Sequence, residues 1–290
     1  MLNIRVPATS ANFGPGFDTL GIALSLYNEY EVELSDTLNI LNDQKGYNPI
    51  DNLFYKTYKY TTKQFNIDNE ITVNFKNINI PISRGLGSSS SLIIAGIMAA
   101  NELNKLKLTK KQILDIATII EGHPDNVAPC IYGGLTINMM IDENNQKRVI
   151  SNKIDIVDDI HFTVIIPNYK TNTEEARKIL PKELPLPKVI ENTSHALLLI
   201  NALKNNDLQN LNLFINDNIH VPYRKELIKD YDSIKELCYK NGAKGFTISG
   251  SGPTMLVISN EENFSKKIAL EGEYKILDLK IDNEGARATI

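Results

Sequence analysis

The feature that most constrains this chain is a glycine- and serine-rich segment that runs straight into an apolar stretch. Residues 81–91 read PISRGLGSSSS, and residues 92–100 read LIIAGIMAA. Serine is favoured at the start of a helix, and the apolar run that follows is typical of a helix buried on all sides. The sequence therefore predicts a loop that opens a buried helix.

Such a loop is suited to binding an anion. Glycines let the backbone approach a ligand closely, and the N–H groups and dipole of a helix start favour phosphate oxygens. Serine hydroxyls add hydrogen-bond donors and also bind Mg²⁺. Taken alone, the same residues fit an ordinary turn with a serine-rich cap equally well.

The common nucleotide-binding motifs are absent from the sequence. No G-x-x-x-x-G-K-[ST] pattern occurs. The glycines of residues 250–253 (GSGP) lead into a predicted strand, whereas those of a dinucleotide fingerprint open a helix. A dehydrogenase is therefore disfavoured.

The order of the predicted elements indicates an α+β protein. The residue pattern predicts strands at 2–6, 30–34, 71–75, 161–167, 245–248, 254–258 and 274–279, and helices at 52–65, 92–100, from 109, from about 173 to 214, at 225–239 and at 262–270. Because these elements do not repeat as βαβ units, α+β layers are favoured over a doubly wound parallel sheet. The polar stretch 142–153 is the candidate boundary between a domain of residues 1–150 and a domain of residues 151–290.

Charge and composition disfavour several classes of protein. The 31 Lys and Arg residues against 35 Asp and Glu give a net charge of −4, which offers no general attraction to nucleic acid. No apolar run approaches the ~20 residues of a membrane span, and the first residues lack the pattern of a secretory signal. Cys130 and Cys238 lie far apart and are interpreted as free thiols. We expect a cytoplasmic protein without a membrane or nucleic-acid partner.

Three further segments are dense in polar and turn-forming residues. They are 9–18 (TSANFGPGFD), 121–126 (EGHPDN) and 249–253 (SGSGP). Each one alone fits an ordinary connection, namely a loop between strands, a helix end stopped by proline and a hairpin turn.

Together with the serine-rich loop, these segments resemble the signature motifs of the GHMP kinases, and they occur in the same order. Further similarity lies in residues 7–14, 123–129, 133–134, 172–177 and 247–253, so that the likeness spans nearly the whole chain. Within the family, the details are most similar to the branch that phosphorylates L-homoserine.

The resemblance implies a GHMP kinase-like two-domain α+β fold. Its N-terminal domain would carry the ATP-phosphate loop, its C-terminal domain would be ferredoxin-like, and the active site would lie in the cleft between them. It also implies transfer of phosphate from ATP, with Mg²⁺, to the side-chain hydroxyl of L-homoserine. The product would be O-phospho-L-homoserine for threonine biosynthesis, and the family suggests a homodimer.

The resemblance also implies roles for individual residues. The ATP phosphates would be wrapped by Pro81, Ile82, Ser83, Arg84, Gly85, Leu86, Gly87, Ser88, Ser89, Ser90 and Ser91. Mg²⁺ would be bound by Glu121 and by Ser88 or Ser89, and Thr173 would lie near the transferred phosphoryl group. The homoserine site would be lined by Asn12, Asp18, His123, Asn126, Arg177 and Arg224.

The chemistry of these residue types agrees with those roles. Arginine offers a carboxylate a bidentate partner that lysine cannot reproduce, and Asp18 is an anion for an ammonium group. Some relatives have an aspartate as general base near the acceptor hydroxyl, whereas this chain has Asn126 beside Asp125. We therefore expect Asn126 to orient the hydroxyl, with direct transfer of the hydroxyl proton to the γ-phosphate.

Two alternatives remain open from the sequence. A mevalonate-type kinase of the same family also binds a carboxylate, so the arginines do not decide between them; the Asp-Asn turn after His123 favours homoserine. A regulatory protein that keeps the fold without catalysis is disfavoured because Ser88, Ser89 and Glu121 are all present.

Overall fold

The computed structural model describes residues 1–43, 48–143, 146–157 and 159–290. The first of its two β-sheets has the strand order β11-β1-β2-β4-β3, and β5 joins it by pairing with β2 and with β6. The bounds of these strands are β1 Leu2–Ala11, β2 Leu20–Ser35, β3 Asn39–Leu41, β4 Glu70–Ile78, β5 Leu135–Glu143, β6 Gln146–Ile154 and β11 Arg287–Thr289. The long antiparallel pair of β1 and β2 forms the centre of this sheet.

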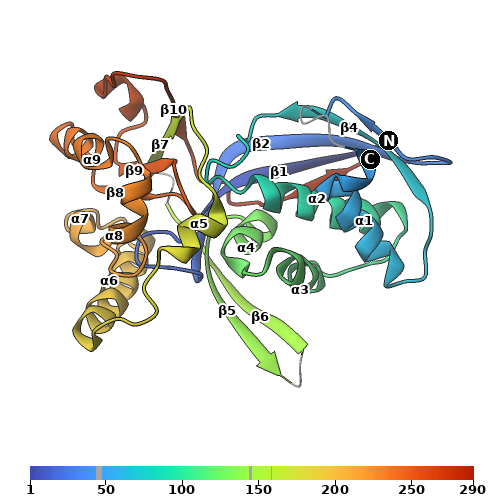
Figure 1. The fold of residues 1–290 in the computed structure, drawn as a ribbon, viewed down its shortest axis with the longest axis horizontal. Helices are drawn as coiled ribbons and strands as arrows, with labels where there is room; N and C mark the ends of the chain where they lie inside the picture. The colour runs from blue at the N-terminus through green and yellow to red at the C-terminus, as the bar shows by residue number, and fades with distance from the viewer. Residues whose placement is uncertain (44–47, 144–145, 158) are drawn as a thin grey trace.

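Four helices cover one face of the first sheet (Figure 1). They are α1 Leu53–Lys63, α2 Ser88–Leu103, α3 Lys110–Glu121 and α4 Pro124–Tyr132, and the short 3₁₀ helix η1 Pro49–Asp51 precedes them. Most of the apolar residues of α2 are buried, as the sequence predicts. Gly96 lets α2 lie against α1, since a Cβ there would come within 2.5 Å of the Phe54 carbonyl oxygen. The helix predicted from residue 109 is confirmed, and Thr109 and Gln112 form a capping box at its start.

The second sheet is antiparallel, with the order β10-β7-β9-β8. Its strands are β7 His161–Pro167, β8 Gly245–Ile248, β9 Met255–Ser259 and β10 Tyr274–Leu279. The helices of this half are α5 Thr173–Lys178, α6 Leu186–Lys204, α7 Leu211–Phe214, α8 Val221–Arg224 and α9 Tyr231–Lys240, with the 3₁₀ helices η2 Lys225–Leu227 and η3 Phe264–Lys267. Across the described residues, no helix has both the length and the apolar character needed to cross a membrane.

One apolar core joins the two sheets and fixes the region between them. Phe13, from the turn between β1 and β2, and Leu20, the first residue of β2, are buried together with Phe162 of β7, Leu199 of α6 and Leu256 of β9. Because these residues come from both halves of the chain, the β1–β2 turn is held against the second sheet. The loops beside that turn are therefore positioned by both sheets.

The α+β class predicted from the sequence is confirmed, and the predicted strands at 161–167, 245–248 and 274–279 match β7, β8 and β10. The prediction of a loop over all of 9–18 is wrong, because Thr9, Ser10 and Ala11 continue β1. Their burial hides the alternation that marks a half-buried strand. The helix predicted at 262–270 is reduced to the 3₁₀ turn η3.

The polar stretch 142–153 contains most of β6, which pairs with β5 in the first sheet; its residues 144 and 145 lie outside the described residues. A strand at the edge of a sheet exposes much of its length, so its sequence reads as polar. The division into residues 1–150 and 151–290 remains a proposal.

Candidate active site

A cavity of about 420 Å³ lies where the two halves of the chain meet. Among its lining residues are most of those that the sequence predicts for the site: Asn12, Ile82, Ser83, Arg84, Gly85, Gly87, Ser88, Ser89, Glu121, His123, Asn126, Thr173, Arg177 and Arg224. Segments that are distant in the sequence thus converge on one space.

Five predicted residues do not line the cavity. Leu86 is fully buried in the apolar core, and Ser90 and Ser91 are buried in the first turn of α2. Asp18 is hydrogen-bonded to Arg177, which does line the cavity, and Pro81 lies at the start of the loop.

The phosphate-loop segment requires glycine at two positions. Gly85 and Gly87 have φ values of +79° and +73°, in the left-handed region. A Cβ on Gly85 would lie 2.2 Å from the Ser249 carbonyl oxygen, and one on Gly87 would lie 2.1 Å from Thr9 Oγ1. No side chain among the described residues caps the start of α2 at Gly87. The first-turn N–H groups of α2 are therefore not covered by a cap and suit an anion.

Hydrogen bonds from neighbouring segments hold this loop. Thr9 N donates to the Leu86 carbonyl oxygen at 3.2 Å, and Thr254 N donates to that of Arg84 at 3.3 Å. Ser249 Oγ donates to the Gly85 carbonyl oxygen at 2.6 Å. Because three successive carbonyl groups of the loop accept hydrogen bonds from other segments of the chain, the loop is held in place by the protein itself.

Glu121, at the end of α3, reaches the serines at the start of α2. Its Oε1 accepts hydrogen bonds from Ser89 Oγ at 2.8 Å and from Ser90 Oγ at 3.0 Å. A carboxylate and hydroxyl oxygens are ligands of the kind that Mg²⁺ prefers, so this set of donors fits the ion. Ser88 lines the same cavity, and the choice between Ser88 and Ser89 as a ligand remains open.

Two arginines meet beside Phe17. The Cζ atoms of Arg177 and Arg224 lie 5.3 and 5.2 Å from the centre of the Phe17 ring. Arg224 is 2% exposed, and its Nε and Nη1 donate to the carbonyl oxygens of Ala176 and Gly250, both at 3.0 Å. Burial, followed by repulsion from Arg177, lowers the pKa of Arg224 to about 10, which still leaves it cationic at neutral pH. This part of the cavity is suited to a carboxylate.

Arg177 forms a forked ion pair with Asp18. Its two terminal nitrogens lie 2.9 and 2.8 Å from the Asp18 carboxylate oxygens, and the side chains are 46% and 33% exposed. The hydrogen bond to Asp18 raises the pKa of Arg177. The pair is therefore within reach of solvent and of a ligand that enters the cavity.

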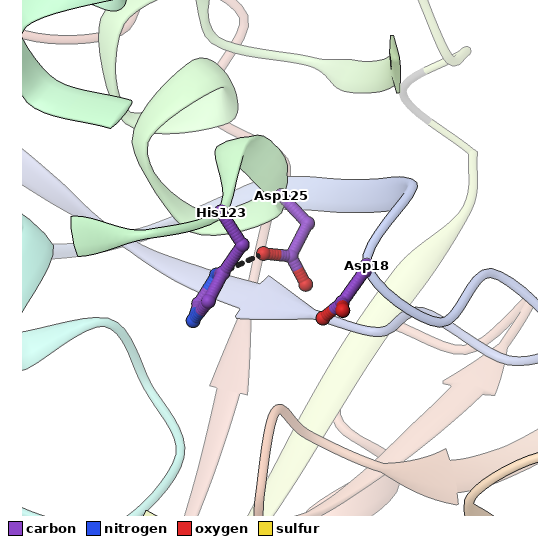
Figure 2. A group of neighbouring side chains, drawn as sticks. All are labelled: Asp18, His123 and Asp125. Carbon is purple, nitrogen blue, oxygen red and sulfur yellow. Dashed lines mark hydrogen bonds and ion pairs between the residues drawn. The ribbon is translucent and has the colours of Figure 1, made fainter. Parts of the chain in front are cut away.

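Asp125 organises the acidic side of the site and is fully buried. Its Oδ1 lies 2.6 Å from His123 Nδ1, and its Oδ2 accepts a hydrogen bond from Asn12 N at 3.1 Å. Figure 2 shows the Asp125 carboxylate between His123 and Asp18. Burial alone would lower the pKa of His123, but the hydrogen bond and charge of Asp125 outweigh it and raise the pKa. One nitrogen or oxygen atom from each of these three residues lies within 4.8 Å of the other two, but the side chains are already engaged by hydrogen bonds and by the ion pair with Arg177.

Asn126 and Thr173 also line the cavity, each from a different element. Asn126, in the first turn of α4, accepts a hydrogen bond at Oδ1 from Thr9 Oγ1 at 2.7 Å. Thr173, the first residue of α5, has its hydroxyl 3.3 Å from Ser251 Oγ. Two polar groups thus face the cavity from opposite halves of the chain.

Part of the cavity was not predicted from the sequence. Its lining includes Tyr30 and Phe75 from the first sheet, Leu53 and Leu92 from α1 and α2, and Asn52, the N-cap of α1. These residues read as core or as a helix cap, and only the packing of β2 and β4 against α1 and α2 brings them together. Asp125 and Thr9 were also missed as site residues, although both lie in segments that the sequence marks as unusual.

Comparison with known proteins is consistent across the chain. The model of the GHMP kinases N terminal domain matches residues 52–134, and that of the GHMP kinases C terminal domain matches residues 199–271. A homoserine kinase of Clostridium botulinum (strain Eklund 17B) is 40% identical over 295 residues, which cover 99% of this chain and 98% of the relative.

Solved structures agree with that match. A homoserine kinase from Cytophaga hutchinsonii superposes with a TM-score of 0.86 at 28% identity, covering 99% of this chain and 97% of the other. A mevalonate kinase from Methanococcus jannaschii gives a TM-score of 0.72 at 19% identity, with 98% of each chain covered. The second likeness shows the fold alone.

Proposed function

The chain belongs to the homoserine kinases of the GHMP kinase family, and from this premise we propose how its residues divide the work of the reaction. The enzyme transfers the γ-phosphoryl group of ATP to the side-chain hydroxyl of L-homoserine, which supplies O-phospho-L-homoserine for threonine biosynthesis. The observation that carries the assignment of residues is a single cavity that joins an anion-binding helix start to two converging arginines.

We propose that the phosphates of ATP bind to the loop from Ser83 to Ser89. The uncapped start of α2 and the fixed carbonyl groups of the loop support this, because N–H groups are then the groups left for phosphate oxygens. The base of ATP would occupy the part of the cavity lined by Tyr30, Phe75 and Leu53, where aromatic and aliphatic surface suits a planar ring.

Glu121 and a loop serine would hold Mg²⁺, which neutralises charge on the transferred phosphoryl group when it is bound. The hydrogen bond between Ser89 and Glu121 holds two oxygen atoms near the phosphate loop.

Homoserine carries both a carboxylate and an ammonium group. We assign the carboxylate to Arg177 and Arg224, and the ammonium group to Asp18. Because Arg177 and Asp18 are paired with each other, a ligand with both charges can replace each partner and leave no charge unpaired. A ligand with a carboxylate but no ammonium group would draw Arg177 away from Asp18 and leave Asp18 without a cationic partner.

The hydroxyl of homoserine would lie beside Asn126 and Thr173. An amide is no general base, so the hydroxyl proton would pass directly to an oxygen of the γ-phosphoryl group. Phosphoryl transfer depends mainly on alignment and charge neutralisation, which the loop, Mg²⁺ and the arginines would supply.

An ADP-release assay with homoserine, mevalonate and shikimate as acceptors tests the function. We expect that, of the three acceptors, only homoserine raises ADP release above the acceptor-free rate. Release with mevalonate and not with homoserine would overturn the assignment. If none of the three acceptors raised ADP release above the acceptor-free rate, a protein that keeps the fold without this catalysis would be favoured. A homodimer and a cytoplasmic location remain proposals from the family, and sedimentation analysis tests the first.

A further inference from the structure

Thr9 connects the phosphate loop to the proposed acceptor site, although it lies inside β1 and is fully buried. Its backbone N–H donates to the Leu86 carbonyl oxygen of the loop. Its hydroxyl lies against Gly87, where a Cβ would come within 2.1 Å of Oγ1. The same hydroxyl donates to Asn126 Oδ1 at 2.7 Å.

The direction of this last hydrogen bond determines what Asn126 presents to the cavity. A hydroxyl has one hydrogen, and an amide has an acceptor oxygen and a donor NH₂ group on the same carbon atom. With Oδ1 held by Thr9, the NH₂ group is the part of the amide that is left to bind a ligand. The NH₂ group can donate a hydrogen bond to the hydroxyl oxygen of homoserine, and the proton of that hydroxyl then remains free of Asn126.

We propose that Thr9 is a positioning residue that fixes the orientation of the Asn126 amide for phosphoryl transfer. This inference rests on the proposed function, because it assumes that Asn126 meets the acceptor hydroxyl. The Asn126 NH₂ group donates a hydrogen bond to the hydroxyl oxygen of homoserine. A lone pair of that hydroxyl oxygen forms the new bond to the γ-phosphorus, and the bond from this phosphorus to the β-phosphate oxygen breaks. The hydroxyl proton passes to an oxygen of the transferred group, and ADP leaves.

Thr9 also packs against Gly87 of the phosphate loop. Its hydroxyl fills the space that a Cβ at Gly87 would need, so the two residues fit together only while residue 87 is glycine. Thr9 therefore contacts the phosphate loop through its backbone and Gly87, and Asn126 through its hydroxyl.

Two variants that differ by one oxygen atom test the proposal: Thr9→Ser keeps the hydroxyl and Thr9→Ala removes it. We expect kcat with homoserine to be about ten-fold lower in Thr9→Ala than in Thr9→Ser, which corresponds to about 1.4 kcal/mol, with KM for ATP changed by less than about two-fold. The same pair of substitutions at Thr57 is the control, because that threonine is buried on α1 and its hydroxyl has no hydrogen-bond partner among the described residues. Thr57→Ser and Thr57→Ala should have equal kcat.

Asn126→Ala, alone and combined with Thr9→Ala, separates positioning from general damage. If Thr9 acts through Asn126, Thr9→Ala lowers kcat little further in the Asn126→Ala background. Fully additive losses, or equal kcat in Thr9→Ser and Thr9→Ala while Asn126→Ala is impaired, would overturn the inference and leave the homoserine kinase function standing. Wild-type kcat in Asn126→Ala would overturn both the proposed role of Asn126 and this inference. Thermal melting checks that each variant is folded, and Thr9→Val, which keeps the side-chain volume, replaces Thr9→Ala if that variant does not fold.

Discussion

Replacing Arg177 by alanine should weaken the use of homoserine without unfolding the protein. A hydrogen bond to a charged partner contributes about 1.5–3 kcal/mol, and about 1.4 kcal/mol is a factor of ten. That range corresponds to a fall in kcat/KM for homoserine of about ten- to a hundred-fold, and the 46% exposure of the Arg177 side chain favours the smaller values. An exposed ion pair such as that with Asp18 adds at most about 1 kcal/mol to stability, so thermal melting should change little.

The assay compares kcat/KM for homoserine with KM for ATP in the same variant. Arg177→Lys should not restore activity, since an ammonium group cannot form the forked contact. Lys178→Ala is the matched control, because Lys178 follows directly in α5, is 78% exposed and has, within the part of the chain that the structure describes, only a 3.7 Å ion pair with Glu174. Arg224→Ala is less informative, since it would also leave the buried carbonyl groups of Ala176 and Gly250 without their donor.

Wild-type homoserine kinetics in Arg177→Ala would refute this reasoning and move the amino-acid site elsewhere. A parallel rise in KM for ATP would instead indicate damage to the whole cavity.

Three further substitutions test other parts of the site. Gly87→Ala should raise KM for ATP by about ten-fold or more, since the left-handed backbone alone costs about 1–2 kcal/mol and the new Cβ would meet Thr9 Oγ1 at 2.1 Å. Gly242→Ala should leave that KM unchanged, because its φ is also positive, at +98°, but its Cβ would meet Glu261 Oε1 at an ordinary contact distance of 3.8 Å. Glu121→Gln should raise the Mg²⁺ concentration for half activity by about ten-fold or more, and an unchanged Mg²⁺ titration would make Glu121 a helix-end carboxylate only. Asp125→Asn should lower the melting temperature more at about pH 5.5 than at about pH 9. Because the pKa of His123 is raised, the pairing of protonated His123 with Asp125 stabilises the fold fully below the ordinary His pKa of 6.5. This stabilisation is lost as the pH rises through the raised pKa of His123. An equal loss at both pH values would contradict that coupling.

The phosphate loop could be predicted from the sequence because its function depends on local features. Glycines at 85 and 87 and serines at the start of α2 are neighbours in the chain, and the structure explains the glycines by contacts with Ser249 and Thr9. The converging arginines could not be predicted by spacing, since tertiary contacts bring them together: both lie near Phe17 on a distant turn, and Arg224 donates to the Ala176 carbonyl oxygen beside Arg177. Their pairing came from the resemblance to the GHMP kinases.

The remaining parts of the site depend on tertiary packing. Thr9 and Asn126 are separated by 117 residues, and nothing local to either one predicts their hydrogen bond. Tyr30 and Phe75 read as strand core, and they reach the cavity only because β2 and β4 lie beside each other there. Buried strand segments such as residues 9–11 lose the alternation on which strand prediction depends, which is why β1 extends beyond its predicted end.

The most direct test of the account identifies the product. The purified protein is incubated with ATP, Mg²⁺ and L-homoserine, and phosphorus NMR and mass spectrometry follow both products. The account predicts O-phospho-L-homoserine, phosphorylated on the side-chain oxygen, in equal amount to the ADP released. ADP formation without phosphohomoserine, or no ADP above the rate without homoserine, would contradict it.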